Sequence, residues 1–161
     1  MPWATSRFVF ACVLAVGCAK GGDAPARPPA APTIDPKLAE PADAMGRHLQ
    51  ELARKAAPDH VPIGTYFRDR LDRGQQRDFL LVLTADRCYR IVGVGDPAVE
   101  DLDLVVFDPA GVQWRQDLDQ NATPVLGADA ELCPPNSGAH RLQVRMTAGQ
   151  GAFLVGVYRT P

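Results

Sequence analysis

A helical pattern of apolar residues marks one segment of the chain, residues 43–57. Its apolar positions follow one another at spacings of four, three and one residues, which places them on one face of a helix. Asp43 has the short polar side chain typical of a helix N-cap, and Pro58 stops the helix. We expect this amphipathic helix to pack against the domain that follows, with partner binding as the alternative. The apolar positions are Met45, Leu49, Leu52, Ala53 and Ala56.

After residue 62 the pattern changes to short runs rich in β-branched and aromatic residues, separated by turns that contain Gly, Pro, Asp or Asn. Short strands that recur at intervals of about 8–12 residues are typical of an antiparallel β-sandwich. Polar and apolar side chains alternate in residues 141–146, which predicts a strand with Leu142, Val144 and Met146 on its buried face. The expected strands are residues 63–68, 77–83, 88–94, 102–108, 112–117, 124–126, 139–146 and 152–158.

The first residues have the features of an export signal. Arg7 is the only early charge, and the apolar run of residues 8–16 leads into Gly17 and Cys18. A basic start, a short apolar stretch and small residues at the cut are the parts of such a signal. The run is about half of the ~20 residues that a membrane-spanning helix needs, so it would make a poor permanent anchor.

Residues 14–18, Leu-Ala-Val-Gly-Cys, resemble the lipobox that bacterial lipoprotein signal peptidases recognise, although Ala15 stands where Leu is usual. In that family the cysteine receives a diacylglyceryl group, and its amine is usually acylated after cleavage. The resemblance implies that residues 1–17 are removed and that Cys18 carries the lipid. Ala19, in place of Asp after the cysteine, favours the outer membrane. An ordinary secretory signal with an incidental cysteine is the alternative.

Residues 19–42 hold six of the fifteen prolines and almost no large apolar side chains. Such a segment cannot bury enough surface to offset the entropy lost on ordering. We interpret it as a tether, and since Pro-rich linkers extend by ~3.1 Å per residue, it could hold the domain up to ~70 Å from the membrane. We therefore expect a signal peptide (1–17), a lipidated cysteine with its tether (18–42), a helix (43–58) and one β-sandwich domain (59–161).

Composition narrows the classes of partner and cofactor. The formal net charge of −2 at pH 7 provides no basic surface of the kind that nucleic-acid binding needs.

The cysteines predict one disulfide bond. With Cys12 in the expected signal and Cys18 expected to carry lipid, Cys88 and Cys133 remain as a pair. Outside the cytoplasm, two leftover cysteines most simply form one disulfide bond. A metal site is the weaker alternative, because no matching pair of histidines accompanies the cysteines.

Residues 76–158 carry three motifs of one bacterial family. The first is Cys-Tyr-Arg-Ile-Val at residues 88–92, and the most specific is Asp-Leu-Asp-Leu-Val-Val-Phe-Asp-Pro-Ala-Gly at residues 101–111. The third, at residues 137–144, has His140 near the usual aromatic position. Together they resemble the bacterial pre-peptidase C-terminal domain. The resemblance implies a jelly-roll-like β-sandwich that serves as a non-catalytic accessory module, and it implies no protease activity.

Few side chains of the exported part suit catalysis. Ser137 is its one serine, and it lies in a Pro-rich turn without a Gly-x-Ser-x-Gly elbow. The chain has neither a phosphate-binding loop nor a His-Glu-x-x-His motif. We therefore expect no enzyme, and a small hydrolase built on Ser137 and His140 is the remote alternative. The other two histidines of this part are His48 and His60.

Acidic residues gather between positions 100 and 131, where Arg115 is the only basic residue. Calcium prefers six to eight oxygen ligands, which loop carboxylates can supply. Since some relatives of this sandwich bind calcium, we regard it as a possible cofactor and expect no other. A solvated acidic rim is the interpretation that the residues themselves favour. The candidate calcium ligands are Asp101, Asp103, Asp117 and Asp119.

Aromatic residues give the last candidate site. Side chains on sandwich strands usually fill the core, which is what we expect of Tyr89, Phe107 and Phe153. Trp114 follows a turn and stands beside Arg115, so a place in the core and a place on a glycan-binding rim are about equally supported. The sequence as a whole indicates a non-catalytic, lipid-anchored envelope protein, a structural or interaction module whose ligand the residues do not identify. An envelope protein and a glycan are the candidate partners, and a calcium- or glycan-binding module is the alternative function.

The lipobox makes a direct prediction about Cys18. Replacing it by alanine, Cys18→Ala, should abolish metabolic labelling with a radioactive fatty acid and move the protein out of the detergent phase. The physical reason is that each buried methylene contributes ~0.8 kcal/mol to membrane binding and the variant would carry none. A wild-type protein that stays in the membrane without any lipid label would contradict the prediction, because an uncleaved apolar helix would then hold it.

Overall fold

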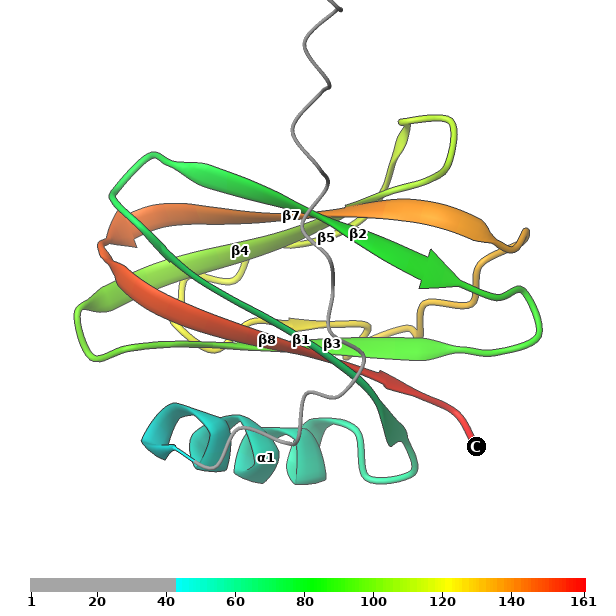
Figure 1. The fold of residues 1–161 in the computed structure, drawn as a ribbon, viewed down its shortest axis with the longest axis horizontal. Coiled ribbons are helices and arrows are strands. Elements are labelled where there is room, and N and C mark those ends of the chain that lie inside the picture. The colour runs from blue at the N-terminus through cyan, green and yellow to red at the C-terminus, as the bar shows by residue number, and fades with distance from the viewer. Residues whose placement is uncertain (1–42) are drawn as a thin grey trace, which may run out of the picture. The chain divides into compact units, whose positions relative to one another are not determined.

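The computed structural model describes residues 43–161, and the signal, the lipobox and the tether lie outside these residues. The described chain forms one helix and eight strands (Figure 1). No helix within it is long and apolar enough to span a membrane. The elements are α1 (Ala44–Ala56), β1 (Val61–Leu71), β2 (Gln76–Leu83), β3 (Tyr89–Gly95), β4 (Val99–Phe107), β5 (Gln113–Asp117), β6 (Val125–Leu126), β7 (Gly138–Gly149) and β8 (Gly151–Arg159).

The strands form two four-stranded antiparallel sheets that face each other. Sheet I has the order β1-β8-β3-β6, and sheet II has the order β2-β7-β4-β5. The pairs are nested along the chain, since β1 pairs with β8, β2 with β7, β3 with β6 and β4 with β5. This nested pairing of eight strands in two sheets is that of a jelly roll. The mostly-β, jelly-roll-like sandwich expected from the sequence is therefore confirmed, and each expected strand is present with its ends shifted by a few residues.

The main core lies between the two sheets and is built by alternation along the strands. In β7, Leu142, Val144 and Met146 are buried in this core, as the sequence predicts. In β8, Phe153 and Val155 point into the same core. Successive side chains of a strand point to opposite faces, so the residues between them lie on the outer faces of the sheets.

Two side chains on the outer face of sheet II have environments that their residue types do not suggest. Phe107 was expected in the core, but it pairs with Arg141 across β4 and β7, and the Arg141 guanidinium lies 3.7 Å from the centre of its ring. Gln143 is polar yet only 4% exposed. Its amide nitrogen donates to Asp78 Oδ1 at 2.8 Å, which satisfies the buried amide.

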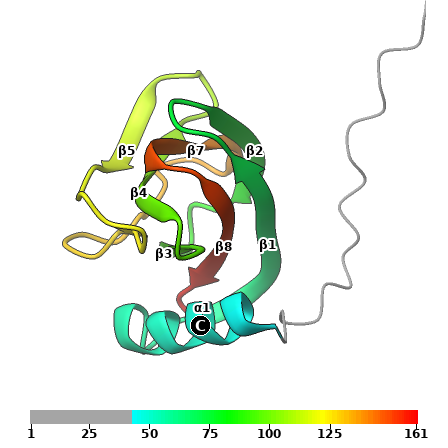
Figure 2. The same cartoon turned by 90° about the vertical axis from the view of Figure 1, so that its left-hand side faces the viewer.

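Helix α1 covers the outer face of sheet I and makes a second core there (Figures 1 and 2). Leu49 and Ala53 are buried against the strands, and the other three apolar positions of the helical pattern are partly buried in the same cluster. At Gly156 of β8, an added Cβ would lie 3.1 Å from a Leu49 methyl carbon, so glycine lets the helix approach the sheet. The expectation that the helix packs against its own domain is confirmed.

The start of α1 is held by Asp43. Its side chain accepts a 2.8 Å hydrogen bond from the Gly46 amide, which makes it the N-cap expected from the sequence. Its other oxygen accepts a 2.5 Å hydrogen bond from Arg68 of β1. The Arg68 hydrogen bond and the helix amide together lower the pKa of the Asp43 carboxyl to about 2. One residue thus caps the helix and ties it to the edge of sheet I.

Candidate functional site

The two cysteines form the disulfide bond that the sequence predicts, Cys88–Cys133. Cys88 directly precedes β3, and Cys133 follows Leu132, which makes a two-residue bridge with Tyr89. The bond spans a sequence separation of 45 residues. In the chain-entropy model a loop of this size stabilises a fold by roughly 3–4 kcal/mol, a large share of the ~5–15 kcal/mol stability of a typical domain.

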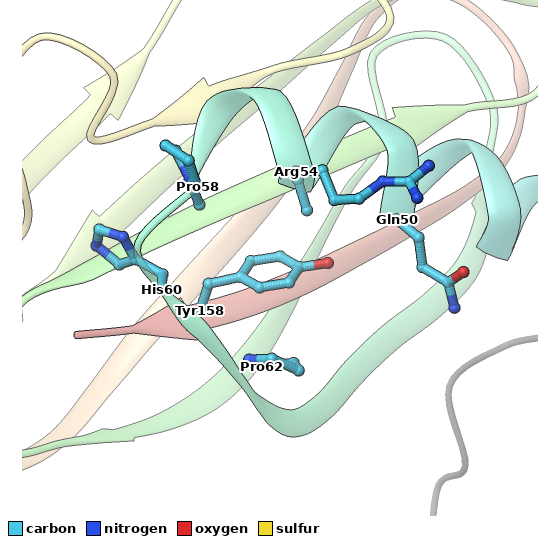
Figure 3. Close-up of a pocket in the computed structure, with 8 residues that line it drawn as sticks. Gln50, Arg54, Pro58, His60, Pro62 and Tyr158 are labelled. Carbon is cyan, nitrogen blue, oxygen red and sulfur yellow. The ribbon is translucent and has the colours of Figure 1, made fainter. Parts of the chain in front are cut away.

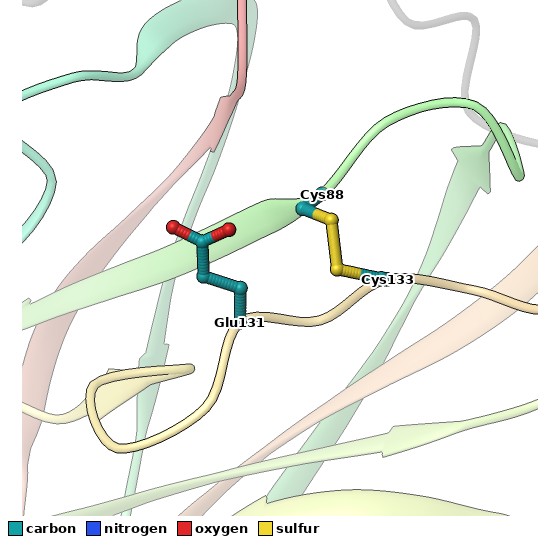
Figure 4. A group of neighbouring side chains, drawn as sticks. All are labelled: Cys88, Glu131 and Cys133. Atoms are coloured by element: carbon teal, nitrogen blue, oxygen red, sulfur yellow. A yellow bond between two sulfur atoms is a disulfide. The ribbon is translucent and has the colours of Figure 1, made fainter.

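Glu131 lies beside the disulfide bond (Figure 4), and together with Arg90 and His60 it forms a polar corner near the end of α1. One of its carboxylate oxygens, Oε1, lies 3.4 Å from Arg90 Nη2 and 3.4 Å from His60 Nε2. Arg90 also donates to the backbone carbonyl of Ala56, the last residue of α1. The His60 side chain is only 3% exposed, and neither ring nitrogen has a hydrogen-bond partner among the described residues. Sequence reasoning did not find this corner, because its residues come from three separate segments, 56–60, 88–90 and 131–133.

A cavity of about 540 Å³ lies beside this corner, between the second half of α1 and the ends of β1 and β8. Figure 3 shows the Tyr158 side chain beneath the helix, with its hydroxyl directed toward the side of the cavity that Gln50 and Arg54 line. Pro58 and Pro62 supply apolar walls. The lining is therefore mixed, with the polar groups of Gln50, Arg54, His60 and Tyr158 beside these apolar walls.

The acidic residues do not form a solvated rim throughout. Asp101 and Asp103 of β4 are only 7% and 8% exposed. Asp103 accepts a 2.7 Å hydrogen bond from the Thr147 hydroxyl, whereas Asp101 Oδ1 is buried and has no hydrogen-bond partner in the described part of the chain. Burial and then the charge of Asp103 raise the pKa of the Asp101 carboxyl above its usual value. Burial is also the main cause that raises the pKa of Asp117.

The four candidate calcium ligands are neighbours but are not gathered around one point. In residues 43–161, three potential metal-binding atoms lie within 4.8 Å of one another at Cys88, Glu131 and Cys133, and not at the aspartates. Asp117 Oδ2 accepts a hydrogen bond from the Val125 amide, and its Oδ1 accepts one from the Asp119 amide. Asp119 itself is exposed. A calcium ion would therefore have to draw these carboxylates together.

The side chains considered for catalysis have structural surroundings. The Ser137 hydroxyl oxygen accepts a 2.9 Å hydrogen bond from the Ala85 amide. His140 is 1% exposed and lies in the core, with Nδ1 3.1 Å from the Gly138 carbonyl oxygen. His48 is exposed on α1. Each of these three side chains therefore has a different environment, on a turn, in the core and on a helix.

Trp114 lies at the edge of the core. It is half-buried and packs against the core cluster, and its ring centre is 5.5 Å from that of His140. The Arg115 guanidinium lies 5.2 Å from the Trp114 ring centre. With one face against the protein and the other beneath an arginine, the ring has the surroundings of a core-edge side chain. Tyr89 and Phe153 are buried in the core, as expected.

The free edge of sheet II at β2 is a feature that sequence reasoning missed. β2 pairs with β7 over residues 76–83 without a register shift, and no strand within residues 43–161 pairs with its other side. Leu80 and Val82 are 58% and 68% exposed there. The signal was present in the sequence as the run Phe-Leu-Leu-Val-Leu at residues 79–83, which is more apolar than a strand with one solvated face requires.

No family model and no curated protein matches this chain. Among solved structures, it is similar to the periplasmic inhibitor PliG of g-type lysozyme from Aeromonas hydrophila, with 16% sequence identity and a TM-score of 0.40. The match covers 60% of this chain and 85% of that one.

The buried carboxyl of Asp101 gives a prediction about stability and pH. A carboxyl whose folded-state pKa lies above its unfolded value destabilises the fold when ionised, and this penalty disappears as the pH falls below the ordinary carboxyl range. Asp101→Asn should therefore raise the melting temperature near neutral pH in a chelating buffer. The gain should shrink steadily as the pH is lowered. The exposed Asp129, changed to Asn, is the control, and an equal gain in both variants would contradict the prediction.

Proposed function

We propose that this chain is a non-catalytic binding protein of the cell envelope, anchored by lipid on Cys18, which binds an extended segment of another envelope protein along β2. The observation that carries the proposal is the regular, apolar and unpaired edge of sheet II at that strand. The surroundings of the catalytic candidates support the non-catalytic part. Ser137 accepts a backbone hydrogen bond, both cysteines are in a disulfide bond, and His140 lies in the core.

The anchor rests on the sequence. The lipobox at residues 14–18 supplies the acylated cysteine, and the Pro-rich segment of residues 19–42 supplies a tether that reaches up to ~70 Å. Ala19 favours the outer membrane as the destination. A domain held in this way can reach proteins of the envelope without leaving the membrane surface, which is the arrangement that a binding module needs.

A comparison of the four edge strands points to β2. An exposed edge invites pairing with another strand, and proteins usually blunt it with bulges, charges or short length. The edge strand β1 has a register shift between Pro62 and Tyr66, β5 pairs with β4 through another shift, and β6 has two residues. β2 has none of these irregularities over its eight residues.

The chemistry of β2 defines the segment that would bind there. Its main-chain groups can form a new antiparallel or parallel ladder, which is the β-augmentation mode of peptide recognition. Leu80 and Val82 project from the outer face at alternate positions and would contact apolar side chains of the incoming strand. Arg77 and Asp78 are charged and exposed, so the apolar contact is confined to residues 79–83. Arg77 is already paired with Asp69 at 2.6 Å.

Site-specific crosslinking in cells tests this edge. A photoreactive phenylalanine analogue at position 82 should give a discrete crosslinked product, whose mapped peptide is an extended, apolar segment. Adding Leu80→Lys should reduce this product by about tenfold, since a charge on an edge strand opposes pairing. The control is the same analogue at position 112, where Val112 is 62% exposed in a turn. The same products at both positions, or none at position 82, would rule out the proposal.

Calcium binding is a second candidate function, favoured by Asp101. Its Oδ1 is buried without a hydrogen-bond partner, and repulsion from the Asp103 and Asp117 carboxylates adds to the cost of its charge. A divalent cation among these oxygens would supply the missing partner and offset the repulsion. Asp117 and Asp119 also line a cavity of about 320 Å³, which would give the ion a route from solvent.

Melting curves in calcium and in magnesium separate a site from general screening. A site filled at 100 times its dissociation constant stabilises the fold by ~2.7 kcal/mol, which raises the melting temperature by several degrees. Screening of a solvated acidic surface would give equal shifts with the two ions. We expect the calcium shift to be larger and to vanish in the double variant Asp101→Asn/Asp103→Asn. Equal shifts in both ions would exclude calcium as a ligand.

A further inference from the structure

The disulfide bond has a third potential metal ligand beside it. The sulfur atoms of Cys88 and Cys133 and a carboxylate oxygen of Glu131 all lie within 4.8 Å of one another (Figure 4). While the two sulfurs are bonded to each other they are poor ligands, because metal ions bind thiolates. Reduction of the bond would turn the same atoms into two thiolates and a carboxylate.

We propose that this corner is a redox-gated zinc site, closed while the Cys88–Cys133 bond is intact and open once it is reduced. Zinc binds cysteine sulfur, histidine nitrogen and carboxylate oxygen, commonly in a tetrahedral arrangement. Ligands at ~2.0–2.3 Å from a tetrahedral ion lie roughly 3.3–3.8 Å apart, so the two sulfurs must separate once their bond is broken, while the carboxylate oxygen, now within 4.8 Å of both, moves closer. Three protein ligands leave the fourth position to water.

Glu131 is already oriented for this role. The contacts from Arg90 and from His60 both fall on Oε1, so Oε2 is the oxygen that can turn toward the sulfurs. Groups that hold a ligand in place from outside the coordination shell affect metal affinity by about 10–100-fold. The buried His60 ring, whose Nε2 lies 3.4 Å from Glu131 Oε1, is a positioning residue of this kind.

The backbone keeps the two cysteines together when the bond between them is broken. Tyr89 and Leu132, their immediate neighbours in sequence, exchange two backbone hydrogen bonds, of 2.9 and 3.0 Å. The Cys88 carbonyl accepts a hydrogen bond from Thr160, and the Cys88 amide donates to the Thr160 hydroxyl oxygen. These contacts do not involve sulfur. The site would therefore be preorganised in the reduced protein rather than assembled by the metal.

The reduction is an ordinary thiol–disulfide exchange with an external dithiol, the class of reductant that the proposal requires. One thiolate of the dithiol attacks Cys133, which is exposed, and releases the Cys88 thiolate. The second thiol of the reductant then displaces Cys133 and closes the reductant's own disulfide. Two electrons and two protons pass to the protein, which gains two thiols. Zinc binding then displaces the two thiol protons, so its affinity falls as the pH is lowered.

The test uses the mature-length chain from residue 18 with Cys18→Ser, so that Cys88 and Cys133 are its only thiols. The protein is reduced with a phosphine, exchanged into oxygen-free buffer and titrated with zinc against a chromophoric chelator. Cobalt is then used as a spectroscopic probe. We expect one zinc per chain in the reduced protein and none in the oxidised protein. The cobalt form should show the sulfur-to-metal charge-transfer band and the strong visible bands of a tetrahedral thiolate site.

Two variants test the assignment of ligands. Glu131→Gln should weaken zinc binding by about tenfold or more, and His60→Asn by about tenfold, because it acts only through Glu131. Glu100→Gln, an exposed carboxylate on β4, is the control and should bind as the parent does. Circular dichroism of each reduced protein shows whether it is folded.

Three results would overturn the proposal. The first is zinc bound equally by the oxidised and reduced proteins, and the second is unchanged affinity in Glu131→Gln, which would leave only two thiols as a chelate. The third is a reduced parent protein that is unfolded and stays unfolded when zinc is added.

Discussion

Sheet I is covered on both faces, and much of the molecule's organisation depends on this constraint. In β8 alternate side chains serve two cores: Phe153 and Val155 face sheet II, whereas Leu154 and Tyr158 face α1. A strand of this kind reads as an almost continuous apolar run, because neither face meets water. The helix is therefore part of the fold, and its N-cap contact with Arg68 ties it to the sheet edge.

Covering sheet I with the helix creates the polar corner at the helix end. The last carbonyls of a helix need partners, and here Arg90 donates to the Ala56 carbonyl. Arg90 in turn holds Glu131, which lies against the disulfide. The corner thus links the helix terminus, β3 and the loop before Cys133.

Sheet II has no helix on its outer face, so its own polar side chains must cover it. Gln143 donates to Asp78, Arg145 donates to Gln143, and Arg141 stacks on Phe107. This ladder buries Gln143 and reaches Asp78 of β2, but it leaves Leu80 and Val82 of that strand exposed. Because α1 packs only on sheet I, the cavity beside the helix lies on that sheet, whereas the exposed apolar residues Leu80 and Val82 lie on sheet II.

The sequence by itself determined the helix, the eight strands and the partners in the disulfide bond. The reason is that these depend on local signals, namely apolar spacing, turn residues and the presence of just two cysteines, Cys88 and Cys133, in the predicted sandwich. The tertiary structure decided how exposed the polar residues are and which of them meet. Asp101 and Gln143 look solvated in the sequence because their residue types are polar, but neighbouring strands bury both. Phe107 looks like a core residue because it is aromatic, but its position in β4 directs it outward.

The candidate sites also differ in how far the sequence alone could predict them. The acidic segment was visible because its residues are close in sequence, although their spacing could not show that Asp101 is buried and that its Oδ1 has no hydrogen-bond partner among the described residues. The corner at Glu131 was invisible, since His60 and Arg90 come from other segments and no motif joins them. The nested pairing of strands brings these segments together, and that pairing depends on long-range contacts that no local pattern specifies.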